Sequence, residues 1–127
     1  VEQEAHVHPF NFSRDSDYRL PLRYVGLLEG GIEADLCGSS GVFSGVTAAK
    51  MILAGAAAVQ TVSALFANGF GHVSTMLNDL ERWMEHKKYD TLGSFRGKLS
   101  KRHTADPWAY TRTQYVRLML NSRQFGL

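Results

Sequence analysis

Two turns rich in small residues carry the groups with which this chain could do chemistry. The first is Gly38-Ser39-Ser40-Gly41, and the second begins at Ser63-Ala64. Small residues let a ligand come close to backbone N–H groups, and the N-terminus of a following helix adds a partial positive charge. This combination suits a phosphate. Glycines that only permit tight turns would produce the same pattern, so that reading stays open.

Other reactive residues form no comparable pattern. His6 and His8 flank Val7 and would lie on one side of a strand, but no acidic or cysteine motif accompanies them, so we expect ordinary polar residues there. Arg96 and Lys98 follow the last expected strand, which favours structural or surface roles. We therefore assign no catalytic residue and no metal ligand from the sequence.

A strand–helix–strand unit over residues 35–65 is expected to position the two turns. Leu36 and Cys37 form a short apolar run before the first turn. A helix follows, capped by Ser44 and ended by Gly55, and residues 57–62 form a second apolar strand. Buried strands joined by a helix make a βαβ unit, which predicts parallel pairing. In (β/α)₈ barrels, the loops after strands seven and eight often hold a phosphate.

Further helices are expected on both sides of this unit. A short helix spans residues 20–29, and a strongly amphipathic helix covers residues 72–87. Another short helix lies within residues 89–99, residues 101–105 form a linker, and Asp106-Pro107 opens a last helix. The apolar faces expected for these last two helices are Leu92, Phe95 and Leu99, and Trp108, Thr111, Tyr115, Leu118 and Met119.

Composition limits the chain to one modest core. Its 127 residues are too few for two domains. The single Cys37 excludes an internal disulfide, predicts a small buried side chain and fits a cytoplasmic setting. A run without Lys or Arg lies between Met51 and Glu81, but polar residues interrupt it before the roughly 20 apolar residues that a membrane span needs.

The net charge of +2 hides an asymmetry between the two parts of the chain. Residues 1–86 hold five Lys/Arg and ten Asp/Glu, whereas residues 87–127 hold nine and two. Such a basic tail can bind nucleic acid or a membrane surface. Here the basic residues are spread through helical segments, so we expect a solvated helical surface and neither nucleic acid nor membrane as a partner.

Three pieces of the sequence together resemble the C-terminal end of a class 1 dihydroorotate dehydrogenase. They are Gly38-Ser39-Ser40-Gly41-Val42 with Ser44-Gly45, Ala54-Gly55-Ala56 leading to the VQTVSAL stretch at 59–65, and KYDTL at 88–92 leading to FRGKL at 95–99. The resemblance covers about residues 20–99. The last piece is the most specific, because nothing in phosphate binding demands it. Residues 106–115 are also similar to a bacterial subgroup called dihydroorotate dehydrogenase-like proteins.

The resemblance implies a TIM barrel that holds FMN at the C-terminal ends of its strands and oxidises dihydroorotate to orotate in pyrimidine biosynthesis. The chain would then be α/β, a single segment over 1–127 that supplies the C-terminal portion of a (β/α)₈ barrel. Its last two βα units would lie within 20–99, and a linker and extra C-terminal helix within 100–127.

The same resemblance implies which residues contact FMN. Ser40 and Gly41 stand where the family has a Gly-Gly pair at the FMN phosphate, and Val62 and Ser63 stand where it commonly has Gly-Thr. Serine and valine at glycine positions make positive φ or very close approach harder. The cofactor-binding residues so implied are Gly38, Ser39, Ser40, Gly41, Val62 and Ser63.

The family's catalytic base and substrate-binding residues lie in earlier strands, so none is assigned here. The chain alone is expected to be inactive and to form an oligomer with the remainder of the barrel or a complementing chain. Two alternatives stay open. One is a piece of another phosphate-binding TIM barrel, such as a lyase or isomerase, and the other is a non-catalytic complementing or assembly fragment.

Overall fold

A computed structural model describes residues 12–120 of the chain, with side chains through residue 113. The expectations for His6 and His8, and for the side chains of Tyr115, Leu118 and Met119, therefore lie outside the described residues. The described elements are the 3₁₀ helices η1 (Asp15–Tyr18), η2 (Leu92–Ser94) and η3 (Lys101–His103), the strands β1 (Cys37–Gly38) and β2 (Ala58–Val59), and the helices α1 (Arg19–Leu28), α2 (Gly45–Ala54), α3 (Ser63–Asn68), α4 (His72–Lys87) and α5 (Pro107–Leu120).

The two strands pair in parallel, as the strand–helix–strand pattern predicts. Cys37 lies opposite Ala58 and Gly38 opposite Val59. A hydrogen bond of 2.8 Å from Gln60 N to Gly38 O continues the ladder by one residue. β2 is shorter than the apolar run over 57–62, and each strand has a single neighbouring strand in the described part of the chain. The fold is thus mixed, with helices around a short parallel sheet.

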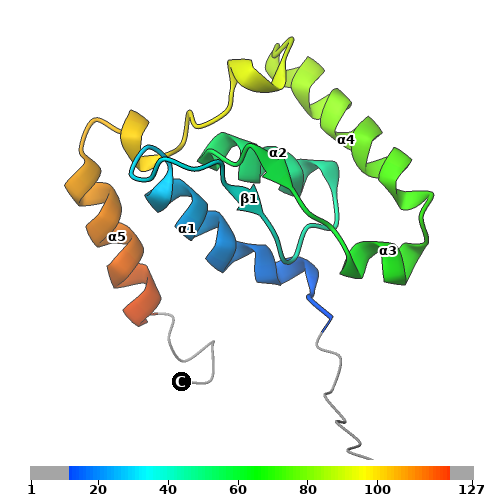
Figure 1. Cartoon of the computed structure of the whole chain (residues 1–127), viewed down its shortest axis with the longest axis horizontal. Coiled ribbons are helices and arrows are strands. Elements are labelled where there is room, and N and C mark those ends of the chain that lie inside the picture. Colours follow the sequence, from blue (N-terminus) through cyan, green and yellow to red (C-terminus); the bar gives the residue numbers. More distant parts are fainter. Residues whose placement is uncertain (1–11, 121–127) are drawn as a thin grey trace, which may run out of the picture.

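Helix α2 is the central element, and Figure 1 shows it between α1 and α4, with α5 at the far side of α1. The Ser44 side chain caps it by accepting a 3.2 Å hydrogen bond from Thr47 N, and Gly55 ends it at a φ of 121°. Both ends were predicted from the sequence. A Cβ at Gly45 would lie 2.8 Å from the Asp79 Cβ and closer still to the α4 backbone, so α2 and α4 cross closely only because this residue is glycine.

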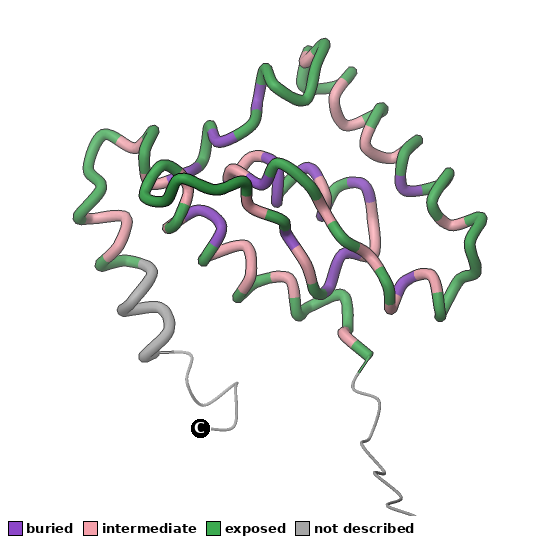
Figure 2. The backbone as a smooth tube through the Cα atoms, viewed as in Figure 1, coloured by how far each residue is buried: buried purple, intermediate pink, exposed green. Residues whose placement is uncertain are grey.

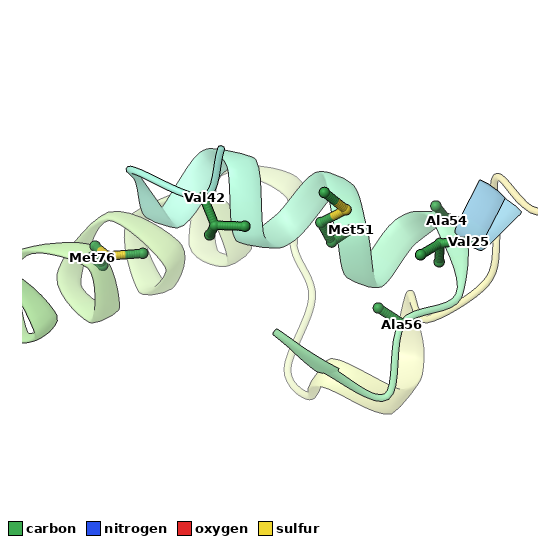
Figure 3. Close-up of a cluster of buried hydrophobic side chains, with 6 residues drawn as sticks. All are labelled: Val25, Val42, Met51, Ala54, Ala56 and Met76. Atoms are coloured by element: carbon green, nitrogen blue, oxygen red, sulfur yellow. The ribbon is translucent and has the colours of Figure 1, made fainter. Parts of the chain in front are cut away.

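The buried residues gather along α2 in the middle of the molecule (Figure 2), whereas most of α4 is exposed or half-buried. Figure 3 shows the main cluster, which extends from α4 through α2 to α1. Its members are Val25, Val42, Met51, Ala54, Ala56 and Met76. Only Met51 is both long and fully buried within this cluster. The core is consequently small, and no helix of the described chain is long and apolar enough to cross a bilayer.

The segment after α4 differs from the helix expected over 89–99. The structure has only the short η2 there, Phe95 is fully buried, and Leu92 and Leu99 are exposed, so the expected apolar face is wrong. Gly97 has a φ of 75°, which interrupts a helix, and its N–H donates to Ile52 O at 2.9 Å. The loop therefore satisfies backbone carbonyls at the C-terminal end of α2 instead of forming helical bonds. Residues 101–103 form η3 within the expected linker.

Two further side chains are exposed against expectation. Cys37 is exposed rather than buried, because successive residues of a strand point to opposite faces and its neighbour Gly38 takes the face that packs on α2. With only two strands described, the other face of the sheet has no covering layer there. Trp108, expected in the apolar stripe of the last helix, is 84% exposed.

Candidate functional site

A cavity of about 180 Å³ lies where both strands end. The parallel pairing brings the turn after β1 next to the turn after β2, since the carboxyl ends of parallel strands meet at one edge of a sheet. The segment before η1 closes the third side. The lining residues are Ser13, Ser39, Ser40, Gly41, Val42, Gln60, Thr61, Val62 and Ser63. Five of the six residues implied to bind the cofactor thus lie together.

Gly38 is the sixth of those residues, and it lies in the sheet instead of the cavity wall. It is buried, and a Cβ on it would lie 3.0 Å from both Cβ and Cγ of Met51. This distance is tighter than ordinary van der Waals contact, so the absent side chain lets α2 pack closely on β1. In this structure Gly38 therefore positions the turn that follows it.

The turn after β1 contains two successive residues with positive φ. Gly41 has a φ of 67°, and a Cβ on it would lie 2.9 Å from the Arg14 carbonyl oxygen and from the Asp17 carbonyl carbon. Segment 14–18 thus packs directly on the Gly41 backbone. Ser40 has a φ of 70°, a left-handed conformation that costs a non-glycine residue about 1–2 kcal/mol. Serine adopts here the conformation for which glycine is suited.

Ser63 joins the second turn to the N-terminal wall. Its Oγ accepts hydrogen bonds from Ser13 N at 3.0 Å and from Ser13 Oγ at 2.9 Å. A serine hydroxyl has two lone pairs and one hydrogen, so these two bonds use its acceptor capacity. The Ser63 O–H then remains as a donor for a ligand.

Two more hydrogen bonds hold the loops around the cavity. Thr61 Oγ1 donates to Val42 O at 2.8 Å and links the two turns directly. His72 Nε2 lies 2.9 Å from Phe43 O, and because a carbonyl only accepts, this nitrogen carries the hydrogen. The first turn is therefore tied both to the second turn and to the start of α4.

The lining offers donors and no titratable side chain. Its polar side chains are hydroxyls and one amide, and among the described residues the backbone N–H groups of Gly41, Val42 and Val62 donate to no protein acceptor. Hydroxyl and backbone N–H donors in a lining that contains no carboxylate suit an oxyanion. Such a site can hold an anion, but it cannot take up a proton. Within residues 12–120 no three His, Cys, Asp or Glu side chains come together as metal ligands would.

An apolar cavity of about 310 Å³ adjoins the polar one and shares Thr61 and Val62 with it. Leu65, Phe66 and Phe70 complete its lining. The two phenylalanine side chains are 75% and 87% exposed, which is unusual for residues of this size. A ligand with a phosphate at one end and an apolar body could therefore occupy both cavities.

Sequence reasoning missed four lining residues. Val42 directly follows the first predicted turn. Gln60 and Thr61 fell inside the strand expected over 57–62, which in fact ends at Val59. Ser13 lies 50 residues from Ser63 and carries no local signal, because only the packing of η1 on Gly41 brings it to the site.

Over about half of its length the chain is similar to known dehydrogenases. It is 35% identical over 65 residues to dihydropyrimidine dehydrogenase (NADP(+)), chloroplastic, of Arabidopsis thaliana, a match covering 51% of this chain and 15% of that protein. It is 36% identical over 67 residues to a probable dihydroorotate dehydrogenase A (fumarate) of Streptococcus pneumoniae, covering 53% and 22% respectively. The chain thus spans less than a quarter of these relatives. No protein-family model matches it. These matches support a dihydroorotate dehydrogenase-like segment without singling out one class of that family.

Proposed function

We propose that this chain is the FMN-binding C-terminal part of a class 1 dihydroorotate dehydrogenase-like oxidoreductase, which oxidises dihydroorotate to orotate in pyrimidine biosynthesis. The observation that carries the proposal is the meeting of two small-residue turns in one donor-lined cavity at the ends of parallel strands. In (β/α)₈ barrels this is the place where phosphates bind. The similarity to a dihydroorotate dehydrogenase and to a dihydropyrimidine dehydrogenase supports an oxidoreductase of this kind over other phosphate-binding barrels.

The residues of the cavity fit the phosphate of FMN. The Ser63 hydroxyl keeps its hydrogen for a ligand, and the N–H groups of Gly41 and Val62 lack protein acceptors. These donors come from both turns, so a phosphate between them would be held from two sides. Hydrogen bonds to an ionised group are roughly twice as strong as those between neutral groups. The adjoining apolar cavity, lined by Phe66 and Phe70, would accept the less polar part of the cofactor.

In this proposal the described chain binds and orients FMN, and its residues do not transfer protons. Bound FMN would supply the hydride acceptor. The residues around the cavity would fix the cofactor through its phosphate, which sets where the rest of the molecule lies. Since no lining side chain is titratable, the catalytic base and the substrate contacts would come from the remainder of the barrel.

We further propose that β1 and β2 complete a sheet with additional strands of the barrel or with a complementing chain. Each strand has one unpaired edge in the described chain, and Cys37 and Ala58 are exposed on the sheet. Unpaired edges and uncovered apolar residues are typical of surfaces that another segment covers. We expect this assembly to be cytoplasmic, since a single cysteine forms no internal disulfide.

The direct test compares FMN with riboflavin, which lacks the phosphate. We expect the chain to bind FMN more tightly, as measured by quenching of flavin fluorescence. Ser63→Ala should raise the Kd for FMN by about 10- to 100-fold, the equivalent of one hydrogen bond to a charged group. The Kd for riboflavin should change little in the same variant.

Ser74→Ala is the matched control, because Ser74 is exposed on α4 and lies outside the cavity. This variant should retain the preference for FMN. Circular dichroism would check that each variant is folded. Equal affinity for FMN and riboflavin, or no binding of either, would contradict the proposal for this chain.

A further inference from the structure

A second cavity, of about 590 Å³, lies between α1, α2 and the segment from residue 98 to Tyr110. It shares no lining residue with the cavity at the strand ends. Its volume falls within the range of about 300–1,000 Å³ typical of small-molecule sites. The cavity is therefore large enough for an organic ligand and much larger than a single inorganic ion requires.

Four cationic side chains from three separate segments line this cavity. Arg19 and Arg23 lie one turn apart on α1, Lys50 comes from α2 and Lys98 from the loop before η3. No acidic residue lines it. Between residues 12 and 113, no carboxylate lies within ion-pair distance of Arg19, Lys50 or Lys98. Lys50 Nζ lies 4.8 Å from the ring centroid of Tyr18, and Lys98 Nζ lies 4.6 Å from that of Tyr89, so both ammonium groups have aromatic partners but no counter-ion. Like charges around one cavity repel each other unless an anion compensates them.

The nearby tyrosines respond to this positive charge. Lys50 Nζ donates a hydrogen bond to Tyr18 Oη at 3.1 Å and lowers the pKa of that phenol, with Arg19 adding to the effect. Burial raises the pKa of Tyr110, and Arg23 opposes that rise. The lowered pKa of Tyr18 has the sign expected beside positive charge, whereas at Tyr110 burial outweighs the charge of Arg23.

The cavity also has apolar lining residues. Among them are Leu22, Leu53 and Leu99. Tyr110, another lining residue, donates a hydrogen bond from its Oη to Leu99 O at 3.3 Å. A ligand that matched this lining would combine at least one negative charge with an apolar body.

We propose that this basic cleft binds a small organic phosphate with an apolar portion, at a site distinct from the cavity at the strand ends. The phosphate would contact Arg19, Lys50 and Lys98, and the apolar portion would lie against the leucines. Arginine and lysine are the side chains that proteins use most for phosphate recognition. The proposal rests on the cleft alone and is independent of whether the other cavity holds FMN.

Phenyl phosphate is a suitable probe, with inorganic phosphate and phenol as its two parts. Isothermal titration calorimetry of the full chain should show a lower Kd for phenyl phosphate than for either part. The double variant Lys50→Gln/Lys98→Gln should raise that Kd at least tenfold. Lys98→Gln alone should give a smaller rise, and it leaves the Lys50–Tyr18 hydrogen bond intact.

The variant Lys87→Gln/Lys88→Gln removes the same charge from outside the cleft and should leave the Kd unchanged. Ser63→Ala should also leave it unchanged, which separates this site from the cavity at the strand ends. No binding of phenyl phosphate would overturn the proposal. Three other results would also overturn it. They are a Kd for phenyl phosphate that rises only in Ser63→Ala, an equal rise in Lys50→Gln/Lys98→Gln and Lys87→Gln/Lys88→Gln, and equal affinity for phenyl phosphate and inorganic phosphate.

Discussion

Ser63 Oγ lies 2.9 Å from Ser13 Oγ and 3.0 Å from Ser13 N, which joins residues 50 positions apart in the sequence. Through this contact the segment before η1 becomes a wall of the cavity at the strand ends. Because Ser63 Oγ accepts both of these bonds, its own hydrogen is not used in the contact with Ser13. This residue pair therefore forms one wall of the cavity and leaves the Ser63 hydroxyl available as a hydrogen-bond donor for a ligand.

The first prediction concerns the stability of this contact. Ser13→Ala and Ser63→Ala should each lower the free energy of unfolding, and the double variant should lose less than the sum. The expected coupling is about 0.5–1.5 kcal/mol, as for a typical hydrogen bond. Urea unfolding of the four proteins measures it. Strictly additive losses would show that the contact contributes nothing.

The second prediction concerns the strained serine. Ser40→Gly and Ser39→Gly each raise the conformational entropy of the unfolded chain by the same amount, which lowers stability equally. Only Ser40 has a positive φ in the folded chain. The Ser40→Gly variant should therefore be more stable than Ser39→Gly by about 1–2 kcal/mol. Denaturant unfolding of both compares them directly. Equal stability would mean that Ser40 is not strained.

The third prediction concerns the close approach at Gly41. Gly41→Ala would combine a positive φ with a clash against the backbone of segment 14–18, and it should cost about 2–4 kcal/mol of unfolding free energy. Gly69→Ala is the control, because Gly69 also has a positive φ, of 78°, and a Cβ there meets nothing within 4 Å. In thermal unfolding, the Tm of Gly41→Ala should be well below the Tm of Gly69→Ala. The reverse order would show that η1 does not pack on Gly41 in solution.

The fourth prediction concerns Cys37, which is exposed on the open face of the sheet. Its thiol should react with 5,5′-dithiobis(2-nitrobenzoic acid) in the native chain at a rate close to that of the urea-unfolded chain. A complementing chain that covers β1 should slow the reaction. Reaction of the isolated chain only after unfolding would show that this face is already covered, for example by a second copy.

The fifth prediction uses the two shifted tyrosines. The pKa of Tyr18 is lowered, so its contribution to stability is present above the usual tyrosine pKa of about 10 and is lost as the pH falls through its folded pKa. The pKa of Tyr110 is raised, so its contribution is present below that pH and is lost as the pH rises. In an ultraviolet titration of tyrosinate, Tyr18→Phe should remove the earliest component and Tyr110→Phe a late one. Lys50→Gln should shift the Tyr18 component to higher pH.

Local patterns in the sequence predicted the elements that local interactions determine. The hydroxyl of Ser44 and the glycine at 55 mark both ends of α2, and the apolar spacing of residues 72–87 matches α4. The parallel pairing of Cys37 with Ala58 also followed, because a helix between two short apolar runs leaves few other arrangements. Five of the implied cofactor residues meet in one cavity for the same reason.

What the sequence did not predict depends on contacts between distant segments. The loop over 89–99 stays irregular because the N–H groups of Gly97 and Leu99 donate to carbonyls of α2. The sequence of the loop alone does not indicate these partners. The apolar run predicts a buried Cys37, but Cys37 is exposed because it lies on the face of the sheet opposite α2, which no described segment covers. Ser13 reaches the cavity only through the packing of η1, and the basic cleft gathers Arg19, Lys50 and Lys98 from three segments.

The lining of the cavity at the strand ends, made of hydroxyls, amides and backbone, has a consequence for proton exchange. A phosphate bound there would neither release a proton from the lining nor take one up. The affinity would then follow only the second ionisation of the phosphate itself, near a pKa of about 6, and level off in the alkaline range. Calorimetry in buffers of different ionisation enthalpy would report almost no buffer contribution above neutral pH. Retention of a bound phosphate would thus depend on pH only below about neutral pH and be constant above it.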